Sequence, residues 1–180
     1  MRKSDIFNIL ALGPVVLGPV AAQTAHAEIY MSEEQAAKSI FPNLQFEKKQ
    51  FQLKPDDVNL VEKTSGETVR SPQLKVYKAP NNDLVFIDQV LGKHEFITYA
   101  VGIESDGTVR GVEILEYRET YGSQVRGEDF KKQFVGKTKL SPLKLDKDIK
   151  GLSGATLSSA HVTAGVRRLL HTYDQIKAQL

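Results

Sequence analysis

The chain has 180 residues, a formal net charge of +2 and 41% hydrophobic residues, which are the proportions of a globular protein. It contains no cysteine, which excludes disulfides, thiol redox chemistry, iron–sulfur clusters and haem attachment through Cys-x-x-Cys-His. Acidic and basic residues are interspersed without a basic cluster, so composition gives no support for nucleic-acid binding.

The first 27 residues have the pattern of a secretory signal peptide. Arg2 and Lys3 precede an uncharged run over residues 6–22, and Ala25-His26-Ala27 places small residues at both positions that a signal peptidase requires. A retained anchor is the alternative and would keep the protein associated with a membrane, but two Gly-Pro pairs interrupt the run. We therefore expect export to the periplasm or another extracytoplasmic space, and a single domain over residues 28–180.

Two helices are predicted at the start of this domain. Ser32 and Gln35 have the spacing of a capping box, so a short helix should begin there and stop before Pro42. A second helix is predicted from Pro55 through Glu62, with its end near Gly66.

The hydrophobic period then changes to two, which indicates strands. The pattern predicts strands over residues 74–77, 84–91, 96–103 and 109–115, and the last two should form a hairpin across Asp106-Gly107. No Gly-x-Gly-x-x-Gly or Walker sequence accompanies them. We expect an α+β fold in which helices pack on an antiparallel sheet, rather than a Rossmann domain.

A polar segment follows the hairpin. It contains the turn Glu119-Thr120-Tyr121-Gly122 and then a predicted short helix over residues 127–134, ending at Gly136. Read from composition alone, this stretch is a strand end, a turn and an exposed helix. Its glutamates are then ordinary solvated charges.

The most informative block is Ser153-Gly154-Ala155-Thr156, followed by Leu157 and a long amphipathic helix. Apolar residues recur at three- and four-residue intervals from Val162 to Leu180, whereas Arg167, Arg168, Asp174 and Lys177 fall mostly off that stripe. The start of such a helix favours a phosphate, since its backbone N–H groups are free and its dipole is positive there. The plainer interpretation is a loop whose hydroxyls, from Ser158 or Ser159, cap the helix.

Metal binding has little support in the sequence. Beyond the predicted signal peptide only His94, His161 and His171 remain, and they lack the spacing of metal ligands. Electron transfer by this chain would therefore require a bound organic cofactor.

Taken together, the exported domain, the hairpin, the Glu119-Thr120 turn and the final Ser-Gly-Ala-Thr block resemble the FMN-binding domain family. That family includes the C subunit of sodium-translocating NADH:quinone reductase and the G subunit of Rnf-type electron transport complexes. The resemblance covers about residues 73–180. Tyr121 stands where the family commonly has proline, and Lys150 where members often have aspartate.

The resemblance implies that FMN is joined through its phosphate to the hydroxyl of Thr156. A flavin transferase that uses FAD and magnesium would make this bond outside the cytoplasm. The surrounding site would comprise Ser153, Gly154, Ala155 and Leu157; Glu119 and Thr120 would lie near the flavin, and Lys150 would add a positive charge.

The function implied is that of an extracytoplasmic electron carrier rather than a self-contained enzyme. Its partners would be redox proteins, for example a membrane-bound electron-transport complex or a haem protein. Two alternatives stay open: an exported module that binds an anion or a partner non-covalently, and a structural subunit of a larger complex.

Overall fold

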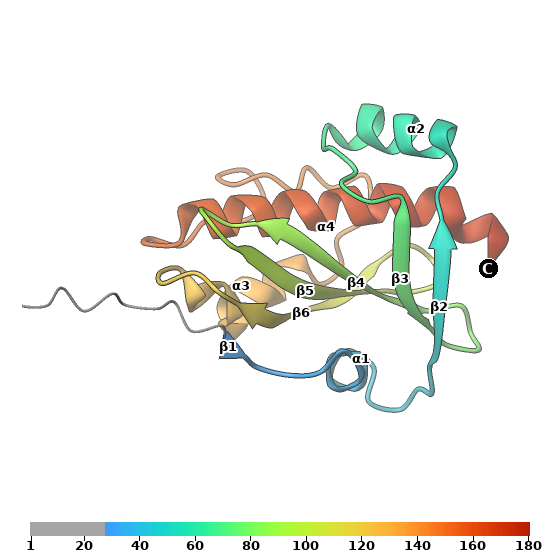
Figure 1. Cartoon of the computed structure of the whole chain (residues 1–180), viewed down its shortest axis with the longest axis horizontal. Coiled ribbons are helices and arrows are strands. Elements are labelled where there is room, and N and C mark those ends of the chain that lie inside the picture. The colour runs from blue at the N-terminus through green and yellow to red at the C-terminus, as the bar shows by residue number, and fades with distance from the viewer. Residues whose placement is uncertain (1–27) are drawn as a thin grey trace, which may run out of the picture.

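The computed structural model describes residues 28–180, so the predicted signal peptide lies outside the described residues. These residues form one antiparallel sheet with helices on both faces (Figure 1), which confirms the predicted α+β class. The strands are β1 (Glu28–Ile29), β2 (Glu47–Gln52), β3 (Gln73–Lys78), β4 (Leu84–Leu91), β5 (Phe96–Ile103) and β6 (Val109–Tyr117). Their order across the sheet is β1-β6-β5-β4-β3-β2.

The helices are α1 (Glu33–Ile40), α2 (Pro55–Ser65), α3 (Glu128–Lys131) and α4 (Thr156–Ile176). Short 3-10 turns occupy Ser123–Arg126, Lys132–Phe134 and Lys177–Gln179. In Figure 1, α4 runs along one face of the sheet, α2 lies on the outer side of α4, and α1 lies on the opposite face.

The first two helices begin and end where their capping residues predict. Ser32 Oγ accepts a hydrogen bond from the Gln35 N–H at 3.1 Å, and the Gln35 side chain accepts one from the Ser32 N–H at 2.7 Å. Pro55 opens α2, and Gly66 ends it in the left-handed conformation that glycine adopts without strain.

The main core lies between the sheet and α4. Phe86 of β4 and Tyr99 of β5 belong to one buried cluster with Val162, Val166 and Leu169 of the helix, and these five side chains are at most 1% exposed. A smaller cluster joins α1 to the other face. Burial of these apolar side chains supplies the main driving force for folding.

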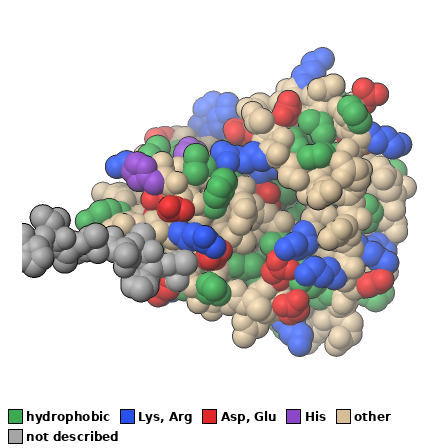
Figure 2. Space-filling model, viewed as in Figure 1, with side chains coloured by type: hydrophobic (Ala, Val, Ile, Leu, Met, Phe, Trp, Pro, Cys, Tyr) green, Lys and Arg blue, Asp and Glu red, His purple; other side chains and the backbone are tan. Residues whose placement is uncertain are grey.

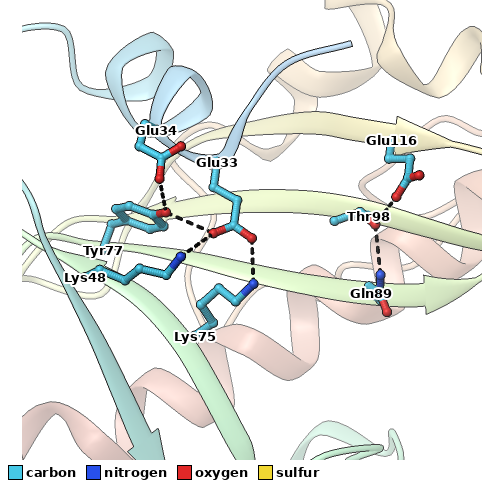
Figure 3. A network of polar contacts seen from close by, with 8 residues as sticks. All are labelled: Glu33, Glu34, Lys48, Lys75, Tyr77, Gln89, Thr98 and Glu116. Atoms are coloured by element: carbon cyan, nitrogen blue, oxygen red, sulfur yellow. Dashed lines mark hydrogen bonds and ion pairs between the residues drawn. The ribbon is translucent and has the colours of Figure 1, made fainter. Parts of the chain in front are cut away.

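Hydrogen bonds and ion pairs fasten α1 to the sheet (Figure 3). Glu33 of α1 accepts hydrogen bonds from Lys75 Nζ at 2.6 Å, from the Tyr77 hydroxyl at 2.9 Å and from Lys48 Nζ at 3.1 Å. Beside it, a separate row of side chains from Gln89, Thr98 and Glu116 crosses three neighbouring strands. The part of this face beside α1 therefore carries polar side chains, with the exposed ring of Phe96 among them.

Arg168 departs from the predicted pattern, because it is only 6% exposed. Its Nη2 lies 2.5 Å from Asp88 Oδ2, and the hydroxyl of Tyr99 donates to the same oxygen at 2.5 Å. A buried guanidinium is tolerated when a carboxylate neutralises it. The ion pair thus lets α4 pack more of its circumference against the sheet than its apolar stripe indicates.

Candidate functional site

The start of α4 presents Thr156 to solvent. Thr156 is the first residue of the helix, it is exposed, and no side chain caps the helix start at Ala155. The backbone N–H groups of the first helical turn have no acceptor within a helix, so they remain available to a ligand. The loop reaches this point through Gly154, whose φ is +78°.

Neither Ser158 nor Ser159 is the N-cap, so that prediction is wrong. Both lie inside the first turns of α4 and are buried. Ser159 Oγ donates to the Ala155 carbonyl at 2.8 Å and accepts from the Leu152 N–H at 3.3 Å. The serine hydroxyl therefore fixes the loop to the helix instead of capping it.

The second segment of the site is the turn that follows β6. The Tyr117 hydroxyl donates to the Tyr121 carbonyl at 2.6 Å and lies 2.9 Å from Ser158 Oγ. Because the phenol has one proton, Ser158 must be the donor in the second bond. This pair of bonds joins the turn directly to the start of α4.

Gly122 allows that close approach. Its φ is +100°, and a Cβ atom at this position would collide with the Tyr117 hydroxyl and lie 3.0 Å from Ser158 Oγ. Only glycine meets both the conformational and the spatial requirement.

Glu119 holds a third segment, the loop between β4 and β5. Its Oε1 accepts backbone hydrogen bonds from His94 at 2.6 Å and from Glu95 at 3.1 Å. Burial acts to raise the pKa of Glu119, but hydrogen bonds from the backbone of His94, Glu95 and Lys93 outweigh it, so the pKa lies below its ordinary value. Glu119 is therefore an ionised clamp between two loops, not a freely solvated charge.

These three segments enclose a pocket of about 460 Å³, within the usual range for small-molecule sites. We call it the Thr156 pocket. Its lining residues are Lys93, His94, Glu119, Thr120, Tyr121, Gly154, Ala155, Thr156, Leu157 and Ser158. In Figure 1 the end of β6 and the start of α4 lie at the same end of the molecule.

Most of the predicted site residues line this pocket. Glu119 and Thr120 meet Gly154, Ala155, Thr156 and Leu157 there, whereas Ser153 and Lys150 are exposed and lie outside its lining. The backbone of Lys150 is instead paired with the side-chain amide of Gln133. Lys93, His94 and Tyr121 line the pocket without having been predicted, because nothing in their local sequence links a strand-end loop to a helix start.

The pocket combines features suited to a phosphate ester of an aromatic compound. The N-terminus of α4 and the side chain of Lys93 favour negative charge beside Thr156. Tyr121 and Leu157 add apolar surface and are 81% and 48% exposed. The residues present thus fit both halves of a flavin mononucleotide.

Comparison with known proteins agrees with this geometry. Residues 92–171 match the family model of the FMN-binding domain, and they include every residue that lines the Thr156 pocket. This match confirms the resemblance predicted from the sequence. No curated protein matches the chain.

The fold is similar to that of the C subunit of Na(+)-translocating NADH-quinone reductase from Parabacteroides distasonis. The two share 17% sequence identity with a TM-score of 0.54, over 81% of this chain and 84% of the other. The likeness confirms the predicted fold. Among residues 28–180, no helix combines the length and the apolar character needed to cross a bilayer.

Proposed function

We propose, from the match of residues 92–171 to the FMN-binding domain and from the predicted signal peptide, that this protein is an extracytoplasmic electron carrier. Its FMN would be linked through the phosphate to Oγ1 of Thr156. One observation carries the proposal: a single pocket joins the exposed Thr156 to the Glu119-Thr120 turn. These two segments are among the features on which the resemblance depends.

The attachment step is a phosphoryl-type transfer. Oγ1 of Thr156 attacks the phosphorus on the riboflavin side of FAD, a new O–P bond forms, and the bond to AMP breaks so that AMP leaves. The threonine proton would pass to a base of the transferase, and the magnesium that this enzyme uses would neutralise charge on the phosphates. Thr156 suits this role because it is exposed and because Gly154 carries no side chain that would block an approaching enzyme.

The chain's own residues then hold the product. A phosphodiester at Thr156 carries one negative charge at the helix start, an arrangement worth about 0.3 to 1 kcal/mol at an exposed site. Lys93 adds a positive charge nearby. The bound FMN supplies the redox chemistry, and the protein supplies position and electrostatics.

A covalent link also explains how an exported protein would keep its cofactor. Outside the cytoplasm free FMN is dilute, and a non-covalent site loses its ligand when the concentration falls below Kd. We expect redox proteins as partners, either a membrane-bound electron-transport complex or a haem protein.

The test is to express the full chain in an exporting host together with a flavin transferase. We expect flavin fluorescence that stays with the polypeptide on a denaturing gel, and an intact mass increased by one FMN less one water. Thr156→Val should abolish both signals, because it keeps the shape but removes the hydroxyl. Thr156→Ser should retain them in part.

Two outcomes would refute the proposal. Wild-type protein with no added mass would favour a non-covalent binding module or a structural subunit. Covalent flavin that persists in Thr156→Val would place the attachment at another residue.

A further inference from the structure

Tyr121 is a large aromatic side chain that the fold leaves out of the core. It lines the Thr156 pocket and is 81% exposed. Its backbone is nevertheless fixed, because its carbonyl accepts the 2.6 Å hydrogen bond from Tyr117 and it precedes the sterically restricted Gly122. An immobile backbone thus carries an aromatic ring with no partner in the chain's core.

A second exposed apolar side chain lines the same pocket. Leu157 follows Thr156 on α4 and is 48% exposed. Tyr121 and Leu157 come from segments that the bond between Tyr117 and Ser158 joins. A planar aromatic ligand seated in the pocket would cover both side chains and remove their apolar surface from water.

Glu119 and Lys93, which also line the pocket, are suited to other contacts than stacking on an aromatic ring. The carboxylate of Glu119 is engaged by backbone N–H groups, and Lys93 is suited to a phosphate. Two of the lining residues, Tyr121 and His94, have aromatic rings, and Tyr121 has the larger one. Stacked or edge-to-face aromatic contacts contribute beyond the area that they bury.

We infer that the ring of Tyr121 packs against the isoalloxazine of the FMN attached at Thr156. The inference rests on the proposed function and deepens it. Tyr121 is then a positioning residue that holds the redox-active ring against the protein. Without it, the flavin would extend into solvent from its phosphate tether.

Flavin emission tests this contact independently of electron-transfer activity. A tyrosine in contact with an excited flavin quenches its fluorescence by donating an electron, and phenylalanine does so far less. In covalently flavinylated protein, Tyr121→Phe should therefore raise the emission several-fold. Tyr121→Ala should raise it as well and should also increase quenching by added iodide, because the ring face becomes accessible.

Tyr173→Phe is the matched control. Tyr173 lies on the same helix as Thr156 but about 25 Å away along its axis, at 1.5 Å per residue. Its removal should leave emission and iodide quenching at the wild-type values. Because Tyr121 is exposed, its variants should also unfold at the wild-type temperature.

The outcomes separate the two proposals. Covalent flavin whose emission and iodide quenching are the same in wild type, Tyr121→Phe and Tyr121→Ala would overturn the contact and leave the proposed function intact. Wild-type protein without covalent flavin would overturn both. A rise in emission confined to the Tyr121 variants would support both.

Discussion

Glu119 shows how a single side chain acquires a role that its sequence context does not reveal. Its carboxylate binds backbone N–H groups of the loop after β4, and those bonds keep its pKa below the ordinary value of 4.5 despite the opposing effect of burial. Gly92 in the same loop leaves room for this carboxylate, since an added Cβ would lie 2.5 Å from Glu119 Oε1.

Glu119→Gln should weaken the protein in a pH-dependent way. A carboxylate whose folded pKa is depressed contributes stability above its unfolded pKa and loses it as the pH falls through the folded value. We therefore expect the wild type to exceed the variant in unfolding free energy by a constant amount above about pH 5, and the difference to shrink below about pH 4.5. Urea titrations across this range measure it; a difference that stays level down to about pH 3 would contradict the clamp.

Gly122 and Gly154 give a matched pair of residues with positive φ. Gly154→Ala meets open space, so it should cost only the left-handed backbone penalty of about 1 to 2 kcal/mol. Gly122→Ala should cost about 1 kcal/mol more, because its Cβ also displaces the Tyr117 hydroxyl. Chemical denaturation compares them, and equal losses would show that the hydroxyl contact is unimportant.

At the scale of elements, the close approach of α4 to the sheet depends on Gly165. A Cβ there would collide with the hydroxyl of Tyr99 and lie 2.9 Å from Val90 Cγ1. The same hydroxyl belongs to the buried group formed with Asp88 and Arg168. The Tyr99 hydroxyl therefore both limits the size of residue 165 and takes part in the buried hydrogen bonds.

Gly165→Ala should destabilise the protein by about 1 to 3 kcal/mol, although alanine is the better helix former. Overpacking is the reason. In the background of Tyr99→Phe, which removes the nearest obstacle but leaves Cζ of residue 99 and Val90 Cγ1 each 2.9 Å from the added Cβ, the same change should cost less but should still destabilise the protein. A double-mutant cycle followed by thermal unfolding measures this coupling; additive effects would mean that the Tyr99 oxygen is not the obstacle.

Elements with strong local signals could be predicted from the sequence. The bounds of β4 and β5 agree with their runs of apolar residues, and α1 with its capping box. β2 was missed because Glu47–Gln52 is mostly charged and polar, as an exposed edge strand often is. The burial of Arg168 was missed because its partner Asp88 lies 80 residues away in sequence.

The candidate site was only partly predictable for the same reason. Thr156 and the Glu119-Thr120 turn were proposed from a family resemblance, and no periodicity brings them together. The side-chain bond that does so joins Tyr117 to Ser158 across 41 residues. Tyr121 enters the pocket through that tertiary contact, whereas Lys93 and His94 enter it because Glu119 binds the backbone of their loop 25 residues away in sequence.

On the scale of the whole molecule, acidic and basic side chains are interspersed over the face seen in Figure 2. The formal net charge of the full chain is only +2. Long-range steering toward a strongly charged partner is therefore weak, and recognition would rest on short-range contacts.

The predicted signal peptide is tested on the full chain. Expressed in an exporting host, the protein should begin at Glu28, since cleavage is expected after Ala27. Intact mass and N-terminal sequencing of the periplasmic fraction measure this. Full-length protein recovered from the membrane fraction would instead support a retained anchor.

The bond between Tyr117 and Ser158 also bears on the order of events during biogenesis. Tyr121 lines the Thr156 pocket from a turn that precedes α4 in the chain. The pocket is complete only when α4 has packed on the sheet, because Thr156 is the first residue of that helix. If the proposed flavin transfer to Thr156 requires this pocket, a truncated or misfolded chain would not be modified. Under that proposal, covalent flavin would be found only on molecules in which α4 has packed on the sheet.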